Sequence, residues 1–70
     1  MDAAHIIALM NRVPFEPFEV HLADGAPIKV DEPWQIATFP ECPTCTIYDT
    51  GERMRIIAFR NITEVITAAG

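Results

Sequence analysis

An Asp-Gly dipeptide between two short alternating segments constrains the fold of this chain more than any other feature. In the stretch FEVHLADGAPIKV, apolar residues occupy every second position of both flanks, which is the period of a half-buried β-strand. A two-residue loop at Asp24-Gly25 would place the apolar side chains of the two strands on opposite faces. A three-residue loop, Ala23-Asp24-Gly25, with Gly25 at a positive φ, places them on one face. The sequence therefore predicts a hairpin that pairs Leu22 with Ala26, Val20 with Ile28 and Phe18 with Val30.

The segment before this hairpin, MDAAHIIALMNRVPFEPF, has the spacing of an amphipathic helix. Apolar residues fall at i, i+3, i+4 and i+7 from Ile6 to Val13. Asp2 can accept hydrogen bonds from the free amides of the first turn. Pro14 and Pro17 oppose further helix, because proline lacks an amide hydrogen and disfavours a helical residue before it. We predict a helix over about residues 2–12, followed by an extended connector.

Three segments downstream of the hairpin have strand character. The stretch DEPWQIATFP is a short element that offers Trp34, Ile36 and Phe39 to the core. The stretch CTIYDTGERMRIIAF is typical of a second hairpin with its turn at residues 49–52. The stretch RNITEVITAAG predicts a tight turn and a β-branched final strand over residues 64–67.

The second strand of the later hairpin is apolar on both of its faces. Met54, Ile56 and Ala58 alternate with Arg55 and Ile57, and Phe59 follows on the same face as Ile57. Strands that are covered on both sides have this composition, whereas strands with one solvated face alternate between apolar and polar residues. We therefore expect this strand to be central or covered on both sides.

These segments predict a mostly β (α+β) fold. An N-terminal helix is followed by about five short antiparallel strands, which we expect to form a strongly bent sheet or a small barrel. A chain of 70 residues allows one domain, over residues 1–70, with its β-rich part at about residues 18–68. So short a chain buries only about 60% of the surface that its unfolded form exposes. Association with another chain would supplement this small core.

The order of the elements resembles that of SH3-like small barrels, and more narrowly the Sm-like arrangement that includes the bacterial Hfq proteins. The similarity lies in the N-terminal helix, the strand leading to LADG, the late hairpin, and AFRNITEVITA as a one-turn connection into a last strand. The segment PFEPFEVHLADG is also similar to a PFxPFxxxLADG segment in a family of small bacterial proteins that begin with a helix. That second resemblance covers most of the chain and implies no activity. The first implies an RNA-binding ring, from which the acidic charge of this chain departs.

The charge of the chain opposes general binding to nucleic acids. Ten acidic residues outnumber five basic ones and give a net charge of −5, whereas sequence-independent binding to phosphate backbones draws on a surplus of Lys and Arg. No apolar run approaches the roughly 20 residues that span a bilayer, so we expect no membrane insertion. The N-terminus lacks the basic flank of a signal peptide, which favours a cytoplasmic location with reduced cysteines.

Cys42 and Cys45 form a C-x-x-C motif that has three possible readings. A redox pair needs its first thiol at a helix N-terminus, but the β-branched and aromatic residues after Cys45 predict a strand. A structural zinc site needs two further donors, and the only histidines, His5 and His21, lie 16 residues apart. The favoured reading is a tight turn that carries incidental thiols. Metal and redox sites remain the alternatives, and the family-like sequences have a Gly-rich turn at this point.

No arrangement of residues in the sequence points to catalysis. His21 alternates to the outer face of its strand with Glu19, without a nucleophile or second carboxylate at a matching spacing. The adjacent acids Asp31 and Glu32 are not placed in the contrasting environments that general acid and base chemistry requires. We therefore expect a protein that is not an enzyme and that needs no cofactor.

A surplus of apolar side chains predicts an association surface. The candidate residues are Ile7 on the helix, Trp34 and Phe59, because one small barrel does not cover all the apolar faces of this chain. The leading interpretation is an interaction module that self-associates, or docks a protein partner, through a strand edge and the helix face. The alternative is an Sm-like RNA-binding protein. It would use a local basic patch of Arg53, Arg55 and Arg60.

Overall fold

The computed structural model describes residues 2–49 and 53–67 of the chain. Their elements are the helix α1 (Ala3–Met10), the strands β1 (Phe18–Leu22), β2 (Ile28–Val30), β3 (Ile36–Ala37), β4 (Thr44–Tyr48), β5 (Met54–Ala58) and β6 (Ile62–Thr67), and the 3-10 turns η1 (Pro33–Gln35) and η2 (Phe59–Asn61). Within the described ranges, no helix has the length and apolar character needed to cross a membrane.

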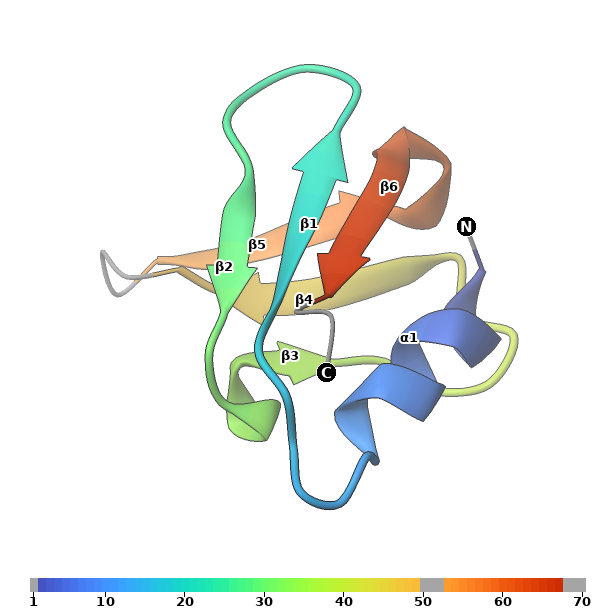
Figure 1. Cartoon of the computed structure of the whole chain (residues 1–70). Helices are drawn as coiled ribbons and strands as arrows, with labels where there is room; N and C mark the ends of the chain where they lie inside the picture. Colours follow the sequence, from blue (N-terminus) through green and yellow to red (C-terminus); the bar gives the residue numbers. More distant parts are fainter. Residues whose placement is uncertain (1, 50–52, 68–70) are drawn as a thin grey trace.

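The strands form two antiparallel sheets that face each other. One sheet has the strand order β2-β1-β6 and the other β3-β4-β5, and their strands run across one another in Figure 1. The mostly β class with an N-terminal helix is confirmed, with six strands in place of about five. The shortest of them, the two-residue β3, lies in the segment DEPWQIATFP. The described strands do not close into a barrel, since β2 and β5 are edges that pair with one neighbour each.

The hairpin of β1 and β2 has the register that the alternation predicts. Phe18 pairs with Val30 and Val20 with Ile28, so all four side chains are buried on one face. Gly25 has a φ of 107°, a conformation that residues with a Cβ rarely adopt. The last pair of this ladder before the loop is Val20 with Ile28, so the predicted pair of Leu22 with Ala26 is not part of it.

Strand β6 joins the other edge of β1 through a β-bulge. His21 pairs with Glu64 and Leu22 pairs with Ile62, which leaves Thr63 as the extra residue. The hydroxyl of Thr63 donates to the carbonyl oxygen of His21 at 3.2 Å. The turn η2 leads directly into β6, which confirms the expected one-turn connection.

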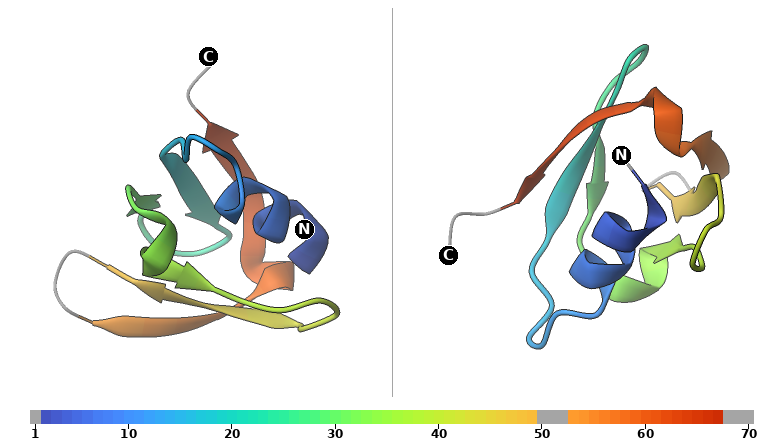
Figure 2. Two further views of the ribbon diagram at one scale, coloured as in Figure 1. Left: turned by 90° about the horizontal axis from the view of Figure 1, so that it is seen from below. Right: turned by 90° about the vertical axis from the view of Figure 1, so that its right-hand side faces the viewer.

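The helix α1 packs beside β3 at one end of the two sheets (Figure 2). Ala3 and Ile6 are buried, and the partly buried Ile7 packs against the core. Asp2 caps the helix, as the sequence predicts, by accepting the backbone N–H of His5 at 3.3 Å. The helix ends at Met10, two residues before the expected position. Its last backbone hydrogen bond is donated by the N–H of Asn11 to the carbonyl oxygen of Ile7.

The structure corrects three expectations for the second half of the chain. Strand β5 is an edge strand with Met54 and Ile56 exposed, so the prediction of a strand covered on both sides is wrong. Trp34 and Phe39 are exposed, and Ile36 alone of its segment enters the apolar core. Phe59 is buried. The predicted turn at residues 49–52 falls largely on residues 50–52, which lie outside the described residues.

Candidate functional site

The outer face of the sheet β3-β4-β5 is an uncharged surface. The buried side chains Ile36, Cys45, Ile47 and Ile57 face the core, so their neighbours along the strands face outward. The outward-facing strand residues are Ala37, Thr44, Thr46, Tyr48, Met54, Ile56 and Ala58. None of these side chains carries a charge, although charged residues make up 21% of the chain.

The part of this surface over the β5 edge and the end of β4 is apolar and accessible. Ile56 lies opposite Thr46, and Met54 lies opposite Tyr48, so the two cross-strand pairs are adjacent on the same face. The exposed fractions are 70% for Ile56, 59% for Met54 and 44% for Tyr48. We call the outward-facing residues of this sheet the outer face. Sequence reasoning missed it, since both faces of β5 carry apolar residues.

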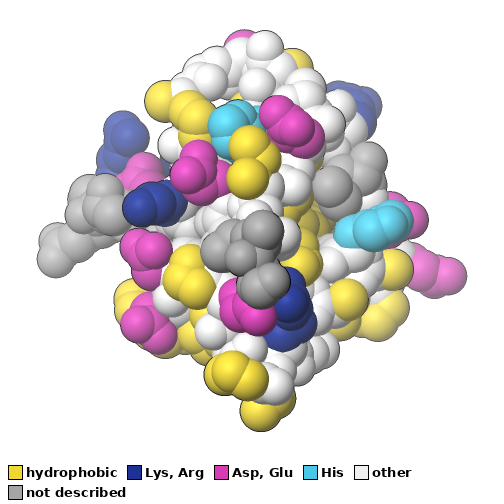
Figure 3. All heavy atoms as spheres, in the orientation of Figure 1, with side chains coloured by type: hydrophobic (Ala, Val, Ile, Leu, Met, Phe, Trp, Pro, Cys, Tyr) yellow, Lys and Arg dark blue, Asp and Glu magenta, His cyan; other side chains and the backbone are white. Residues whose placement is uncertain are grey.

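The outer side of the sheet β2-β1-β6 differs in composition. Glu19 lies opposite Lys29, and His21 lies opposite Glu64. Figure 3, in the orientation of Figure 1, shows acidic and basic side chains interspersed over this side of the molecule. A mixed charged surface of this kind is typical of a face that remains in water. The two sheets therefore present chemically distinct outer surfaces.

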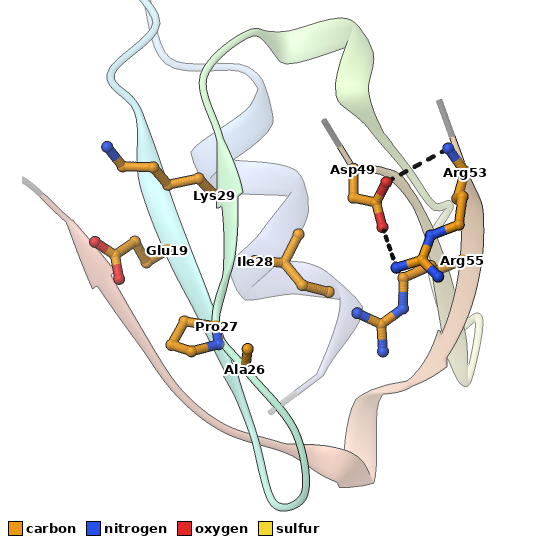
Figure 4. A pocket seen from close by; sticks show the side chains of 8 residues that line it. All are labelled: Glu19, Ala26, Pro27, Ile28, Lys29, Asp49, Arg53 and Arg55. Carbon is orange, nitrogen blue, oxygen red and sulfur yellow. Dashed lines mark hydrogen bonds and ion pairs between the residues drawn. The ribbon is translucent and has the colours of Figure 1, made fainter. Parts of the chain in front are cut away.

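A hollow lies between the edge strand β2 and the ends of β4 and β5 (Figure 4). Its volume is about 640 Å3, and its lining residues are Glu19, Ala26, Pro27, Ile28, Lys29, Asp49, Arg53 and Arg55. Three of the five basic residues of the chain are among them. The predicted basic patch is divided, because Arg53 and Arg55 line this hollow. Arg60 lies in η2, beyond the other end of β5, and lines a different hollow with Pro43 and Thr44.

The two cysteines occupy different environments. A turn ends at the first residue of the motif: Cys42 donates its amide hydrogen to the carbonyl of Phe39 at 3.1 Å, and Glu41 has a φ of 65°. The predicted turn is therefore displaced towards the N-terminus, because it ends at Cys42, and Cys45 belongs to β4. Both thiols are free.

The surroundings of the two thiols shift their acidities in opposite directions. A backbone hydrogen bond from Thr44 lowers the pKa of Cys42, whose side chain is partly accessible. Burial, and secondarily the neighbouring Cys42, raise the pKa of Cys45 to about 11. Cys42 is thus the more reactive thiol of the pair.

The remaining polar candidates lie apart from one another. The Nε2 atom of His21 lies 3.3 Å from an oxygen of Glu19, and the Nδ1 atom of His5 lies 2.9 Å from an oxygen of Asp2. Across residues 2–49 and 53–67, no three His, Cys, Asp or Glu side chains gather in a way that could hold a metal ion.

The predicted interaction residues divide between surface and core. Trp34 is 69% exposed and stands next to β3 in the chain. Ile7 is partly buried against the core, and Phe59 is 4% exposed. Phe59 is therefore part of the core that supports the sheets. The prediction of an accessible side chain at this position is wrong.

Comparisons of the chain with protein-family models, curated proteins and solved structures find no match. What the chain does must therefore be inferred from its own geometry.

Proposed function

We propose that the protein is a non-enzymatic interaction module that self-associates by packing the outer face of one copy on the outer face of a second. The observation that supports this proposal is the uncharged composition of the outer face, with the apolar side chains of Tyr48, Met54 and Ile56 exposed together on β4 and β5. Exposed contiguous apolar surface is the usual mark of an association site on a small domain. Aromatic residues and Met are also enriched at protein interfaces.

The charge distribution favours a second copy as the occupant. Two chains that each carry a net charge of −5 repel one another, so contact is least unfavourable where no carboxylate is brought near another. The outer face meets this condition, because none of its side chains is charged. A two-fold dimer also requires a surface that is complementary to itself. Opposed layers of Ile, Met, Tyr and Thr satisfy that requirement without any charge pairing.

Association would also stabilise the chain. A domain of this length has a small core, and removing exposed apolar side chains from water contributes roughly 25 cal/mol for each Å2 buried. Ile56 and Met54 are the described β5 side chains that would gain most, since both are more than half exposed.

The test is the mass of the protein in solution as a function of concentration, measured by sedimentation equilibrium. We expect the wild type to shift from monomer to dimer between micromolar and millimolar concentrations. Ile56→Glu places a carboxylate among the exposed apolar side chains of the outer face and should abolish the dimer. Val13→Glu is the matched control. It makes the same charge change at a side chain that is 95% exposed outside the sheets, and it should dimerise like the wild type.

Two outcomes would overturn the proposal. One is a wild type that stays monomeric through the whole concentration range. The other is an Ile56→Glu variant that dimerises as strongly as Val13→Glu. Circular dichroism melts of the three proteins show whether the variants are folded. Because both substituted positions are exposed, all three melts should be similar at low concentration.

A further inference from the structure

The alternation of β5 gives its two faces different chemistry. Met54 and Ile56 face outward, whereas Arg55 faces the hollow with Arg53 on the same side. The cross-strand partner of Arg55 is Ile47, which is fully buried, so Arg55 lies where the core meets the open gap between β2 and β5. A cation at such a position is partly removed from water and calls for an anionic partner.

Arg55 has no such partner within residues 2–49 and 53–67. Two other arginines of the described chain form ion pairs. The guanidinium of Arg53 lies 3.3 Å from the carboxylate of Asp49, and that of Arg12 lies 3.2 Å from the carboxylate of Glu16. No hydrogen bond or ion pair involves the guanidinium of Arg55 in these ranges. The chain carries twice as many acids as bases, so an accessible arginine without a carboxylate is unexpected.

Asp49 holds Arg53 beside Arg55. Its Oδ1 accepts the backbone N–H of Arg53 at 3.4 Å, and its Oδ2 accepts from the guanidinium at 3.3 Å. Figure 4 shows both guanidinium groups on the side of β5 that faces β2. A guanidinium has five N–H donors, so the bond to Asp49 leaves other donors of Arg53 available to the hollow.

The opposite wall of the hollow is apolar. It is formed by Ala26, Pro27 and Ile28, and the side chain of Ile28 points toward Arg55 in Figure 4. Glu19 and Lys29, which are cross-strand neighbours, extend to the other side of β2, away from the two arginines. The carboxylate of Glu19 therefore does not compete for Arg55. A volume of about 640 Å3 is within the range of small-molecule sites, which is roughly 300–1,000 Å3.

We propose that Arg53 and Arg55 bind the oxyanion, carboxylate or phosphate, of a small organic anion whose apolar part lies against Ala26, Pro27 and Ile28. Two oxygens of such a group match the planar fork of a guanidinium and accept two parallel hydrogen bonds from it. Arg55 supplies the unpaired charge, Arg53 adds a second donor set oriented by Asp49, and the β2 wall excludes water from the apolar part. This site is separate from the outer face and does not depend on self-association.

The test is a two-dimensional NMR titration that follows the arginine Nε–Hε signals at constant ionic strength. The probes are phenylacetate and phenyl phosphate, with acetate and inorganic phosphate as counterparts that lack the apolar part. We expect saturable shifts of Arg55 and Arg53 and unchanged signals from Arg60. At least one phenyl probe should bind more tightly than its counterpart. The stronger of the two phenyl probes identifies the oxyanion as a carboxylate or a phosphate.

Variants separate specific binding from general attraction to charge. Arg55→Gln should weaken binding at least about tenfold, because it removes the charged hydrogen bonds. Arg60→Gln makes the same charge change at the other end of β5 and should leave affinity unchanged. Arg55→Lys keeps the charge but loses the fork, so it should bind with intermediate affinity.

Some results would overturn the site. These are shifts that rise linearly without saturation, equal responses at Arg60, or equal affinities of Arg55→Gln and Arg60→Gln. All titrations are repeated in the Ile56→Glu background. Dimerisation can then fail there while the site binds, or the site can fail while the wild type dimerises, so the two proposals are tested independently.

Discussion

The side chain of Gln35 connects η1 to β4 by donating from Nε2 to the carbonyl oxygen of Tyr48 at 3.1 Å. Its Oε1 accepts the backbone N–H groups of Asp31 and Glu32 at 2.8 and 2.9 Å. Gln35 is 7% exposed and is the buried polar residue of the described core. One side chain therefore satisfies three backbone groups where the chain passes from the first sheet to the second.

We predict that Gln35→Met lowers the free energy of unfolding by about 2 kcal/mol. The variant leaves three backbone groups without their hydrogen-bond partner, and each unsatisfied buried polar group costs about 1–3 kcal/mol. The total is smaller than three such costs, because water can reach some of these groups. Urea unfolding of the variant should show a lower midpoint with an unchanged slope. The control is Trp34→Ala at the exposed neighbouring residue, which should change the free energy of unfolding by no more than about 0.5 kcal/mol. Equal midpoints for Gln35→Met and wild type would contradict the bridging role.

The adjacent residues Ile56 and Ile57 provide a matched test of the two faces of β5. Ile57 is 5% exposed and Ile56 is 70% exposed. Ile57→Ala should cost about 2–5 kcal/mol in the free energy of unfolding, because it leaves a cavity in the core. Ile56→Ala should cost less than about 1 kcal/mol at low concentration, where only strand propensity changes. The measurement is chemical denaturation of both variants, and the reverse order would place β5 with the wrong face inward.

The two thiols should react at different rates with iodoacetamide at neutral pH. The native chain should gain one adduct, at Cys42, because a hydrogen bond from the Thr44 amide lowers the pKa of Cys42 and its side chain is partly accessible. Cys45 is 1% exposed and its pKa is raised, so it should react only after unfolding in denaturant. Mass spectrometry of peptide fragments identifies the modified residue. Rapid modification of Cys45 in the native protein would contradict the described burial.

Burial of Cys45 also makes stability depend on alkaline pH. The folded protein holds this thiol neutral to about pH 11, whereas the unfolded chain ionises it near 9.0. The part of the folding stability that depends on this neutral thiol is therefore fully present below pH 9. It is lost as the pH rises from 9 toward 11, because the unfolded state releases the thiol proton first. In urea unfolding between pH 8 and 11, wild type should lose more stability than Cys45→Ala. Parallel pH profiles for the two proteins would disprove this linkage.

The part of the fold that could be predicted has strong local signals. The register of β1 and β2 follows from strict alternation around Asp24-Gly25, since a register shift of one residue would expose every apolar side chain of a strand. The helix cap at Asp2 and the turn into β6 are likewise set by neighbouring residues. In each case the physical cause lies within a few residues of its effect.

The candidate sites were less accessible to prediction. Arg53 and Arg55 could be placed on one strand face, but the opposite wall of their hollow comes from Ala26, Pro27 and Ile28, more than twenty residues earlier in the chain. Nothing local shows that β2 and β5 are edges on either side of one gap. The sequence places Arg60 near the other arginines, yet in the fold η2 follows the far end of β5.

The sequence by itself determined the mostly β class, the hairpin register and the helix start, because these depend on spacing and turn chemistry. Only the tertiary structure decided which face of β5 is inward, since Ile56 and Ile57 are equally apolar. The pairing of β5 with β4 decides which face is inward. Cys45 lies opposite Ile57, and Ile47 lies opposite Arg55. Because Cys45 and Ile47 are buried in the core, their partners on β5 lie on the inward face. The same choice placed Ile56 on the outer face and Arg55 in the hollow, and thereby created both proposed sites.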